Sequence, residues 1–493
     1  MANQAGHAPD ERPLVAVAKR ANALRIVGAD RQARQKGLYS GLAFADAKAR
    51  VPQMRVVEHD EKADRDVLEA IADWCDRYSP IVTSAPPDMI MLDVTGVPHL
   101  FGGEEALLSD IEMRLARQGF AARLALCGTA RSARAQCRFG KGGVFQKHDS
   151  AEAAGLLPIE ALECGPDTLL ALSRAGLTRL ADLIDRPRKP LAARFGKELT
   201  ETLALILEEF DRPLTPRRQL PDFTVEQRFA DPIGLMDDIS LALDSLTTRL
   251  CRELETSGQG GRSFELSFYR ADGKVERIGL LSGQALKEPK VLKRLLEMRL
   301  DALADPLDPG FGFDMMRLSV LAGDGLAPRQ SGLDGTMECE VAVAELVDRL
   351  SARFGAGSVH RFVPENTHLP ERASRSIPAI SDIEGTGKWG DGSSEIPTRP
   401  LFLFYPAHKL EVVAEVPDGP PRRFRWRGVL YDVAKAEGPE RIAPEWWRET
   451  KDRRTRDYFR VEDESGRRFW LFRYGLYGRE AEAVQWFLQG VFS

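Results

Sequence analysis

The sequence SPIVTSAPPDMIMLDVTG, which runs from Ser79 to Gly96, contains two short apolar segments separated by Pro86-Pro87-Asp88. Neither proline can donate a hydrogen bond to a strand ladder, so the chain has to turn between the two segments. We therefore expect a β-hairpin with strands at residues 81–85 and 89–94. Asp88 stands at the start of the second strand, where a side chain projects past the edge of a sheet into solvent.

Strands and helices are expected on both sides of this hairpin. Upstream, the β-branched run PLVAVAK, from Pro13 to Lys19, predicts a buried strand, and the apolar spacing after it predicts a helix at 60–77. Downstream, the pattern predicts helix 104–118, strand 121–126 and helix 129–139. Residues 13–150 are therefore expected to form an α/β or α+β sheet domain.

Two further domains follow. Residues 155–215 have helical apolar spacing without a strand signal, and they end in the proline- and arginine-rich linker 211–221. Residues 222–324 have the order strand, helix, strand, strand, helix, strand, which is the split ferredoxin-like arrangement. Its middle strands meet at Ala271-Asp272-Gly273, where Asp-Gly favours a tight hairpin.

The last part of the chain differs in composition. Residues 325–395 are expected to contain a helix at 342–354 and then a mobile linker from 364 to 400, rich in Gly, Ser, Pro and charge. Residues 396–493 contain short aromatic strands and five of the seven tryptophans. We expect a small, mostly β domain that ends in a helix at 480–488, and the fold class as a whole is α+β multidomain.

Composition limits the function classes. The chain has 493 residues, 69 Lys and Arg against 74 Asp and Glu, and a formal net charge of −5. It contains neither the ~18 unbroken apolar residues of a membrane span nor a signal peptide, so we expect a cytoplasmic protein with no membrane partner. The six cysteines occur singly, which indicates no metal site. Because DNA binding depends on phosphate neutralisation, this acidic chain would need local basic patches to bind DNA.

The carboxylates of the hairpin allow two interpretations. A carboxylate that follows a turn is a typical Mg²⁺ ligand in phosphoryl-transfer sites, which makes Asp88 and Asp93 candidates. However, Met89 is a soft thioether that a hard cation does not use, and Asp93 lies on the other face of the strand from Asp88. A solvated turn aspartate with a structural Asp93 is the simpler interpretation.

The hairpin resembles the palm of the Y-family translesion DNA polymerases, in which a Ser-Ile-Asp-Glu turn precedes a strand that ends in Leu-Asp-Val-Thr. Asp88 matches that family's catalytic Asp, and Met89 stands where its metal-supporting Glu belongs. The resemblance implies a palm and fingers in residues 13–150, a helix-hairpin-helix thumb in 155–215 and a little-finger domain in 222–324.

Other catalytic positions of that family are also altered. Segment 29–57 resembles the fingers and keeps Arg34, whose counterpart contacts the triphosphate. In the helix that carries an Asn-Lys pair in the family, Ser132 and Ala133 take those places. The family's first palm strand, with its Asp-x-Asp-x-Phe-Phe motif, should precede Pro13, where only twelve residues are found. We therefore expect no polymerase activity and no cofactor, because losing single members of such a site costs orders of magnitude in rate.

This pattern resembles the catalytically inactive ImuB type of Y-family homologue, found in bacterial mutagenesis cassettes. The resemblance implies an adaptor in damage-induced (SOS) translesion synthesis, cytoplasmic and associated with the nucleoid. Its implied partners are DNA, the sliding clamp, a RecA-like ImuA-type protein and an error-prone C-family DNA polymerase. The alternative is an active error-prone Y-family polymerase that uses Mg²⁺ and whose first strand lies above an incorrectly assigned start. A third hypothesis is a DNA-structure-binding protein that acts through the helix-hairpin-helix alone.

Several residues could contact DNA or partners. A helix-hairpin-helix binds phosphate through backbone N–H groups at a helix start, which selects Gly165 and Thr168. A basic cluster in the little finger, which is a DNA-binding face or a solvated helix face, consists of Lys287, Lys290, Lys293 and Arg294. In the last domain arginines alternate with aromatic residues, a composition that suits single-stranded nucleic acid, a protein interface or a sheet core. The candidates there are Arg425, Trp426, Arg454 and Arg456.

A clamp-binding motif places a Gln and spaced apolar residues in a surface pocket. Gln330 and Leu333 fit this pattern just after the little finger, although Asp334 replaces the apolar anchor. The segment from Gln219 to Phe223 is a second match, and its alternative interpretation is the entry of the chain into the first strand of the little finger.

Overall fold

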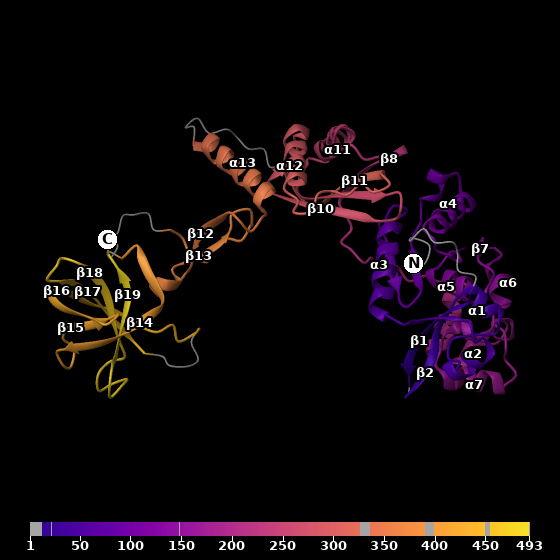
Figure 1. Ribbon diagram of the computed structural model, residues 1–493, viewed down its shortest axis with the longest axis horizontal. Coiled ribbons are helices and arrows are strands. Elements are labelled where there is room, and N and C mark those ends of the chain that lie inside the picture. The colour runs from indigo at the N-terminus through magenta and orange to yellow at the C-terminus, as the bar shows by residue number, and fades with distance from the viewer. Residues whose placement is uncertain are drawn as a thin grey trace. The chain divides into compact units, whose positions relative to one another are not determined.

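The computed structural model describes residues 12–20, 22–146, 148–325, 336–389, 399–448 and 454–492. The chain divides into two compact units, residues 1–330 and 331–493, which we call unit 1 and unit 2. Figure 1 shows the elements of each unit in the colours of the chain. The predicted strand at the start of the chain and the predicted hairpin are both present.

Unit 1 begins with a small sheet that has its own core. Its strands and helices are β1 (Leu14–Arg20), β2 (Ala23–Ala29), α1 (Arg31–Gln35), α2 (Phe44–Arg50) and β3 (Arg55–Glu58). The strand order is β2-β1-β3, with β1 antiparallel to β2 and parallel to β3. Buried Val15, Val17 and Ile26 form the centre of this core. This fingers-like part is therefore packed separately from the predicted hairpin.

The hairpin belongs to a second core. Its elements are α3 (Glu61–Cys75), β4 (Val82–Ala85), β5 (Met89–Leu92), η1 (Pro98–Phe101), α4 (Glu104–Arg117), β6 (Ala125–Leu126), α5 (Ala130–Phe139) and β7 (Gly143–Val144). β4 and β5 pair antiparallel, as predicted, whereas β6 pairs with β7 in a separate two-stranded sheet. The strands of residues 13–150 thus form three small sheets among the described residues. Trp74, Tyr78 and Leu107 lie at the centre of the core that α3 and α4 share with the hairpin.

The thumb is helical, as the apolar spacing predicted. It consists of α6 (Ser150–Gly155), η2 (Ile159–Leu162), α7 (Pro166–Arg174), α8 (Ala181–Ile184), α9 (Arg188–Phe195) and α10 (Lys197–Ile206). Leucines from each of the longer helices meet in one core, in which Leu172, Leu183 and Leu203 are fully buried. Glu163 ends η2 in the left-handed conformation, with φ of 48°. This turn directs its side chain toward α5.

The little finger has the predicted order of elements. They are β8 (Phe223–Ile233), α11 (Met236–Thr256), β9 (Gln259–Arg270), β10 (Val275–Leu286), α12 (Pro289–Asp301) and β11 (Phe313–Gly325). The sheet order is β10-β9-β11-β8, so each helix crosses over one intervening strand, and all neighbours are antiparallel. Both helices cover one face of the sheet (Figure 1), where each fully buried leucine contributes roughly 1.5–3 kcal/mol. The other face carries arginines.

Unit 2 contains a helix, a short hairpin and a closed barrel. These are α13 (Thr336–Phe354), β12 (His360–Pro364), η3 (Pro370–Arg372), β13 (Ser374–Pro378), and the barrel strands β14 (Phe402–Ala414), β15 (Pro421–Trp426), β16 (Val429–Ile442), β17 (Arg456–Asp463), β18 (Arg468–Tyr474) and β19 (Gln485–Val491). The barrel is closed by antiparallel pairing of β14 with β19. Apolar side chains that alternate along the strands fill its interior.

Two predictions for this unit are wrong. The expected linker from 364 to 400 contains β13 and η3, and Leu369 is buried against Tyr458 and Trp470 on the outside of the barrel. The expected final helix is instead β19, because Trp486 and Leu488 alternate into the barrel interior and complete its last strand. In both places tertiary burial of a few apolar residues outweighs a polar or helix-favouring local composition.

Candidate functional site

Asp88, the candidate catalytic carboxylate, lies in the turn before β5 and forms an ion pair with Arg138 of α5. The same guanidinium also contacts Glu163 of the thumb, with an Nη1–Oε1 distance of 3.2 Å. Arg138 therefore bridges two carboxylates at the point where the resemblance places a catalytic metal ligand. Met89, which follows Asp88, is buried in the hairpin and offers no oxygen.

Three arginines of α5 converge on Glu163. Arg131, Arg134 and Arg138 are three and four residues apart, so they lie on one face of the helix. The Arg131 Nη1 and Arg134 Nε atoms lie 2.9 and 2.7 Å from Glu163 Oε2. Burial works to raise the pKa of Glu163, but the Arg134 hydrogen bond and the charges of the three arginines outweigh it and lower the pKa. This cluster stabilises a carboxylate without a metal.

The other polymerase-like positions do not join this cluster. Asp93 Oδ1 accepts a hydrogen bond from the Thr95 backbone N–H at 3.0 Å, which is the structural role expected for a turn aspartate. Arg34 is exposed, and its Nε donates to the Ala29 carbonyl at 2.9 Å. Ala133 lies on α5 and has no charge to offer. Across the described residues, no three His, Cys, Asp or Glu side chains are grouped so that they could hold a metal ion.

A network of ion pairs joins the open face of the little-finger sheet to α3. Arg277 of β10 lies 3.2 Å from Asp73 and 2.6 Å from Asp76, both at the end of the α3 segment. From the linker before the little finger, Arg217 contacts the same two carboxylates at 3.0 and 3.3 Å, and Arg218 contacts Asp73 at 2.8 Å. We call these five residues the α3 charge network. Because Arg217 and Arg277 are each only about one-eighth exposed, their charges are held by the carboxylates rather than by water.

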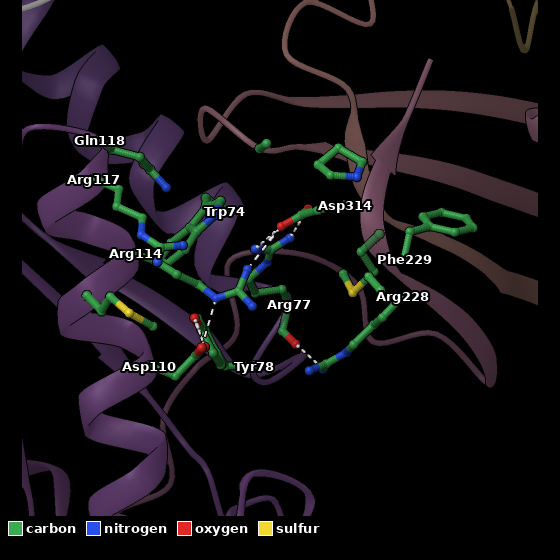
Figure 2. Close-up of a pocket in the computed structure, with 15 residues that line it drawn as sticks. Trp74, Arg77, Tyr78, Asp110, Arg114, Arg117, Gln118, Arg228, Phe229 and Asp314 are labelled. Atoms are coloured by element: carbon green, nitrogen blue, oxygen red, sulfur yellow. Dashed lines mark hydrogen bonds and ion pairs between the residues drawn. The ribbon is translucent and has the colours of Figure 1, made fainter. Parts of the chain in front are cut away.

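Next to this network lies a cavity of about 300 Å³ between α3, α4 and strands β8 and β11. Figure 2 shows Arg77 and Arg114 pointing toward Asp314 of β11, at 2.5 and 3.0 Å. Arg114 also holds Asp110, which accepts a hydrogen bond from the Tyr78 hydroxyl. Arginines of the palm are thus neutralised by carboxylates of the palm and little finger, and the Nε of buried Arg77 has no hydrogen-bond partner.

Sequence reasoning missed these arginines. The pattern of residues 222–324 was interpreted only as an order of strands and helices, and the two faces of the sheet were not separated. The available signal was the alternation along β10 and β11, where Arg277 and Arg317 each stand next to a residue that is buried on the helix side, Ile278 or Leu318. Arginines at these positions have to face away from the core.

The predicted DNA-binding residues are accessible but not grouped. Gly165 is the exposed N-cap of α7, and the Thr168 N–H bonds to the Gly165 carbonyl at 3.0 Å. Lys293 lies 3.3 Å from Asp244 of α11, so one of the four cations in the basic cluster is already paired. The remaining three are exposed or lie at the surface of α12 and the turn before it, namely Lys287, Lys290 and Arg294. The structure therefore leaves both interpretations of this cluster open.

Only one of the two segments that match the clamp-binding motif lies among the described residues. Gln330 and Leu333 lie outside the described residues. In the second match, the Gln219 side chain donates to the Leu321 carbonyl at 2.8 Å, and Asp222 N bonds to Val320 O at 2.8 Å. That segment is held against β11 as it enters β8, as the alternative interpretation expected.

Two of the four candidates in the last domain, Trp426 and Arg456, support the barrel. Trp426 packs on the barrel core, and its Nε1 donates to His408 Nδ1 at 3.0 Å. Arg456 is mostly buried and lies 2.6 Å from Glu371, which fixes η3 to the barrel. Arg454 lies over the Tyr474 ring at 5.8 Å, and Arg425 is exposed near Glu411 at 3.6 Å. The interpretation as a sheet core holds for Trp426 and Arg456.

Comparison with known proteins shows what this chain is similar to. The impB/mucB/samB family matches residues 8–135, and a domain of unknown function, DUF6504, matches residues 404–493. DNA polymerase IV of Ralstonia nicotianae is 26% identical over 236 residues, which is 46% of this chain and 66% of that protein. DinB from Sulfolobus solfataricus is 15% identical, with a TM-score of 0.36 over 64% of this chain and 93% of that one. The family match places residues 8–135 in the Y-family polymerase-like class.

A more specific match identifies the family. Protein ImuB of Caulobacter vibrioides (strain NA1000 / CB15N) is 37% identical over 467 residues, which covers 93% of this chain and 100% of that protein. This chain belongs to the ImuB family. Membership of this family, together with a Y-family polymerase domain, fits a role in translesion synthesis across damaged DNA. Among the described helices, none combines the length and apolar character that crossing a membrane requires.

Proposed function

We propose that this protein is a non-catalytic, polymerase-like adaptor in damage-induced (SOS) translesion synthesis. It binds DNA weakly, and it recruits the sliding clamp, a RecA-like ImuA-type protein and an error-prone C-family polymerase. The observation that carries the non-catalytic half is the Arg138 bridge between Asp88 and Glu163. A guanidinium repels Mg²⁺ and takes up the carboxylate that a metal would need.

The weak DNA binding rests on the charge of the little finger. The arginines on the open face of its sheet are paired with carboxylates, either those of α3 or Glu226 of β8, which lies 2.9 Å from Arg317. Paired arginines release fewer counterions when they meet phosphate, so they add little to affinity. The rest of the proposal, the set of protein partners, is supported by membership of the ImuB family.

Primer extension by the purified full-length chain tests the catalytic half. With Mg²⁺, all four nucleotides and protein in excess over primer, we expect incorporation at least ~10³-fold slower than by an active Y-family polymerase assayed alongside, because several members of the site are missing. Arg138→Ala, which releases Asp88, is expected to stay equally inactive. Template-dependent incorporation by the unmodified chain would instead support the active-polymerase alternative.

Clamp binding tests the recruiting half. Replacing Gln330 and Leu333 together by alanine is expected to weaken binding to an immobilised sliding clamp by about 10-fold or more, since a few anchor residues carry most of the energy of such contacts. Gln219→Ala is the matched control, because that side chain is held by Leu321. If only the control variant loses affinity, the motif has been placed in the wrong segment.

A further inference from the structure

Unit 2 exposes two adjacent tryptophans in the segment after β16. Trp446 is 68% exposed and Trp447 is 56% exposed. Their rings are 5.7 Å apart and nearly perpendicular, so they present two different faces to solvent. The other tryptophans of the barrel sequence, Trp426, Trp470 and Trp486, pack on its cores. Large exposed aromatic side chains that are rigidly placed are typical of binding sites.

The surroundings hold Trp447 in place beside a hollow of about 530 Å³. Its lining comes from three separate places in the sequence of unit 2: Asn366, Thr367, His368, Thr386, Trp447 and Arg448. The His368 ring lies edge-on to Trp447 at 6.0 Å, and its Nε2 is 2.8 Å from the Ala443 carbonyl oxygen. The indole is therefore a prearranged platform, which costs less entropy to use than a mobile side chain.

Arginines lie around this platform. Glu445 is completely buried, accepts a hydrogen bond from the Thr367 hydroxyl, and lies 3.5 Å from Arg448 and 3.9 Å from Arg372. The Arg448 side chain remains 39% exposed, so the buried carboxylate positions its guanidinium group while part of that group still faces solvent. Glu445 Oε2 itself has no hydrogen-bond partner, which leaves its charge to these two arginines.

The second acidic residue near the hollow, Glu365, is also hydrogen-bonded. Glu365 accepts hydrogen bonds from Arg375 and from the Thr386 hydroxyl, each at 2.8 Å. Arginines and engaged carboxylates thus surround an aromatic platform that has amide and hydroxyl groups beside it. An exposed indole face for an unpaired base, next to guanidinium groups for phosphate, is the combination by which proteins bind single-stranded nucleic acid. A duplex has no free base face to stack here.

We propose that the hollow beside Trp447 is a binding site for single-stranded DNA, with one base stacked on the Trp447 ring and an adjoining phosphate on Arg448. Trp447 and Arg448 lie in the part of the chain that matches a domain of unknown function, whereas the rest of the lining precedes that part. It is independent of the polymerase-like unit, so the outcome of primer extension does not bear on it.

Fluorescence anisotropy of a labelled oligothymidine of about 16 nucleotides tests this site in the full-length chain. Trp447→Ala is expected to weaken binding about 10-fold, and Trp447→Phe, which keeps a stacking ring, is expected to weaken it less than 3-fold. Tyr405→Ala is the matched control, because Tyr405 is 79% exposed on β14 of the same barrel and lies outside the hollow. Circular dichroism and thermal melting establish that each variant is folded.

Three results would overturn the proposal. Unchanged affinity of folded Trp447→Ala would show that the ring does not stack on a base. An equal loss in Tyr405→Ala would show a diffuse effect of the barrel surface. If polyglutamate displaced the oligothymidine from this site as effectively as unlabelled oligothymidine does, at the same ionic strength, the hollow would be shown to bind an acidic peptide.

Duplex DNA of the same length is expected to compete at least 10-fold less well than the single strand.

Discussion

Replacing Arg473 with methionine is expected to lower the stability of the unit 2 barrel by about 3–5 kcal/mol, because it leaves a buried carboxylate without its closest partner. Arg473 is 1% exposed, and its Nη2 lies 2.5 Å from Asp457, which is completely buried. Arg473 also forms an ion pair with Asp418 at 2.8 Å. Arg441 lies 2.7 Å from Asp457, but it is half exposed, so in the variant it replaces only part of the lost interaction with Asp457.

Hydrogen exchange of the β17 and β18 amides in the full-length chain measures this loss where it occurs. The matched control is Arg468→Met on the same strand, β18, where the exposed side chain lies 3.3 Å from Glu462. We expect a change within about 0.5 kcal/mol there. The double variant Arg473→Met, Asp457→Asn should recover part of the loss, since it removes the buried charge as well. Equal protection in Arg473→Met and Arg468→Met would contradict the argument.

The same pair predicts how barrel stability depends on pH. Burial works to raise the pKa of Asp457, but the hydrogen bonds from Arg441 and Arg473 outweigh it and lower the pKa below its usual value. A carboxyl with a lowered pKa in the folded state stabilises the fold above its unfolded pKa of about 3.9, and this stabilisation is lost as the pH falls through the folded pKa. Barrel protection should therefore fall below about pH 4.

Replacing Asp73 and Asp76 together with asparagine is expected to raise the affinity of the full-length chain for DNA about 10-fold at low salt. The two substitutions remove the carboxylates that hold Arg217, Arg218 and Arg277 in the α3 charge network. Freed arginines can neutralise phosphates and release counterions, so the slope of affinity against salt should become steeper. For Asp73, burial works to raise the pKa, but the Arg218 hydrogen bond and the charge of Arg277 outweigh it and lower the pKa. For Asp76, burial outweighs the charges of Arg277 and Arg217 and raises the pKa.

The control changes the same amount of charge on the same helix. Glu61 and Asp64 lie at the exposed start of α3. Glu61 pairs with Arg65, but the Arg65 side chain is already 60% exposed, so the control variant releases no buried arginine. The double variant Glu61→Gln, Asp64→Asn should raise affinity less than 2-fold. If it raises affinity as much as the Asp73, Asp76 variant does, net charge rather than the release of arginines explains the effect. Unchanged affinity in both variants would show that the open sheet face does not take part in DNA binding.

The local pattern of the sequence was sufficient for most elements. The hairpin followed from Pro86-Pro87, and the six elements of the little finger followed from alternation and from the Asp-Gly turn, with Gly273 at φ of +94°. The family resemblance assigned Asp88 and Met89 to an altered polymerase site. These features depend on residues that are close along the chain, or on short motifs, so they can be predicted from one sequence.

The sequence did not reveal which charged residues form ion pairs when they lie far apart along the chain. Asp88 and Arg138 are fifty residues apart, Arg77 and Asp314 more than two hundred, and no local pattern pairs them. The same applies to Leu369, whose burial on the barrel gives order to a segment that reads as a linker. The sequence by itself determined the elements and the family, because these follow from local periodicity and short motifs. Only the tertiary structure decided which charges are neutralised and which aromatic rings stay exposed, because both depend on what folding brings next to each side chain.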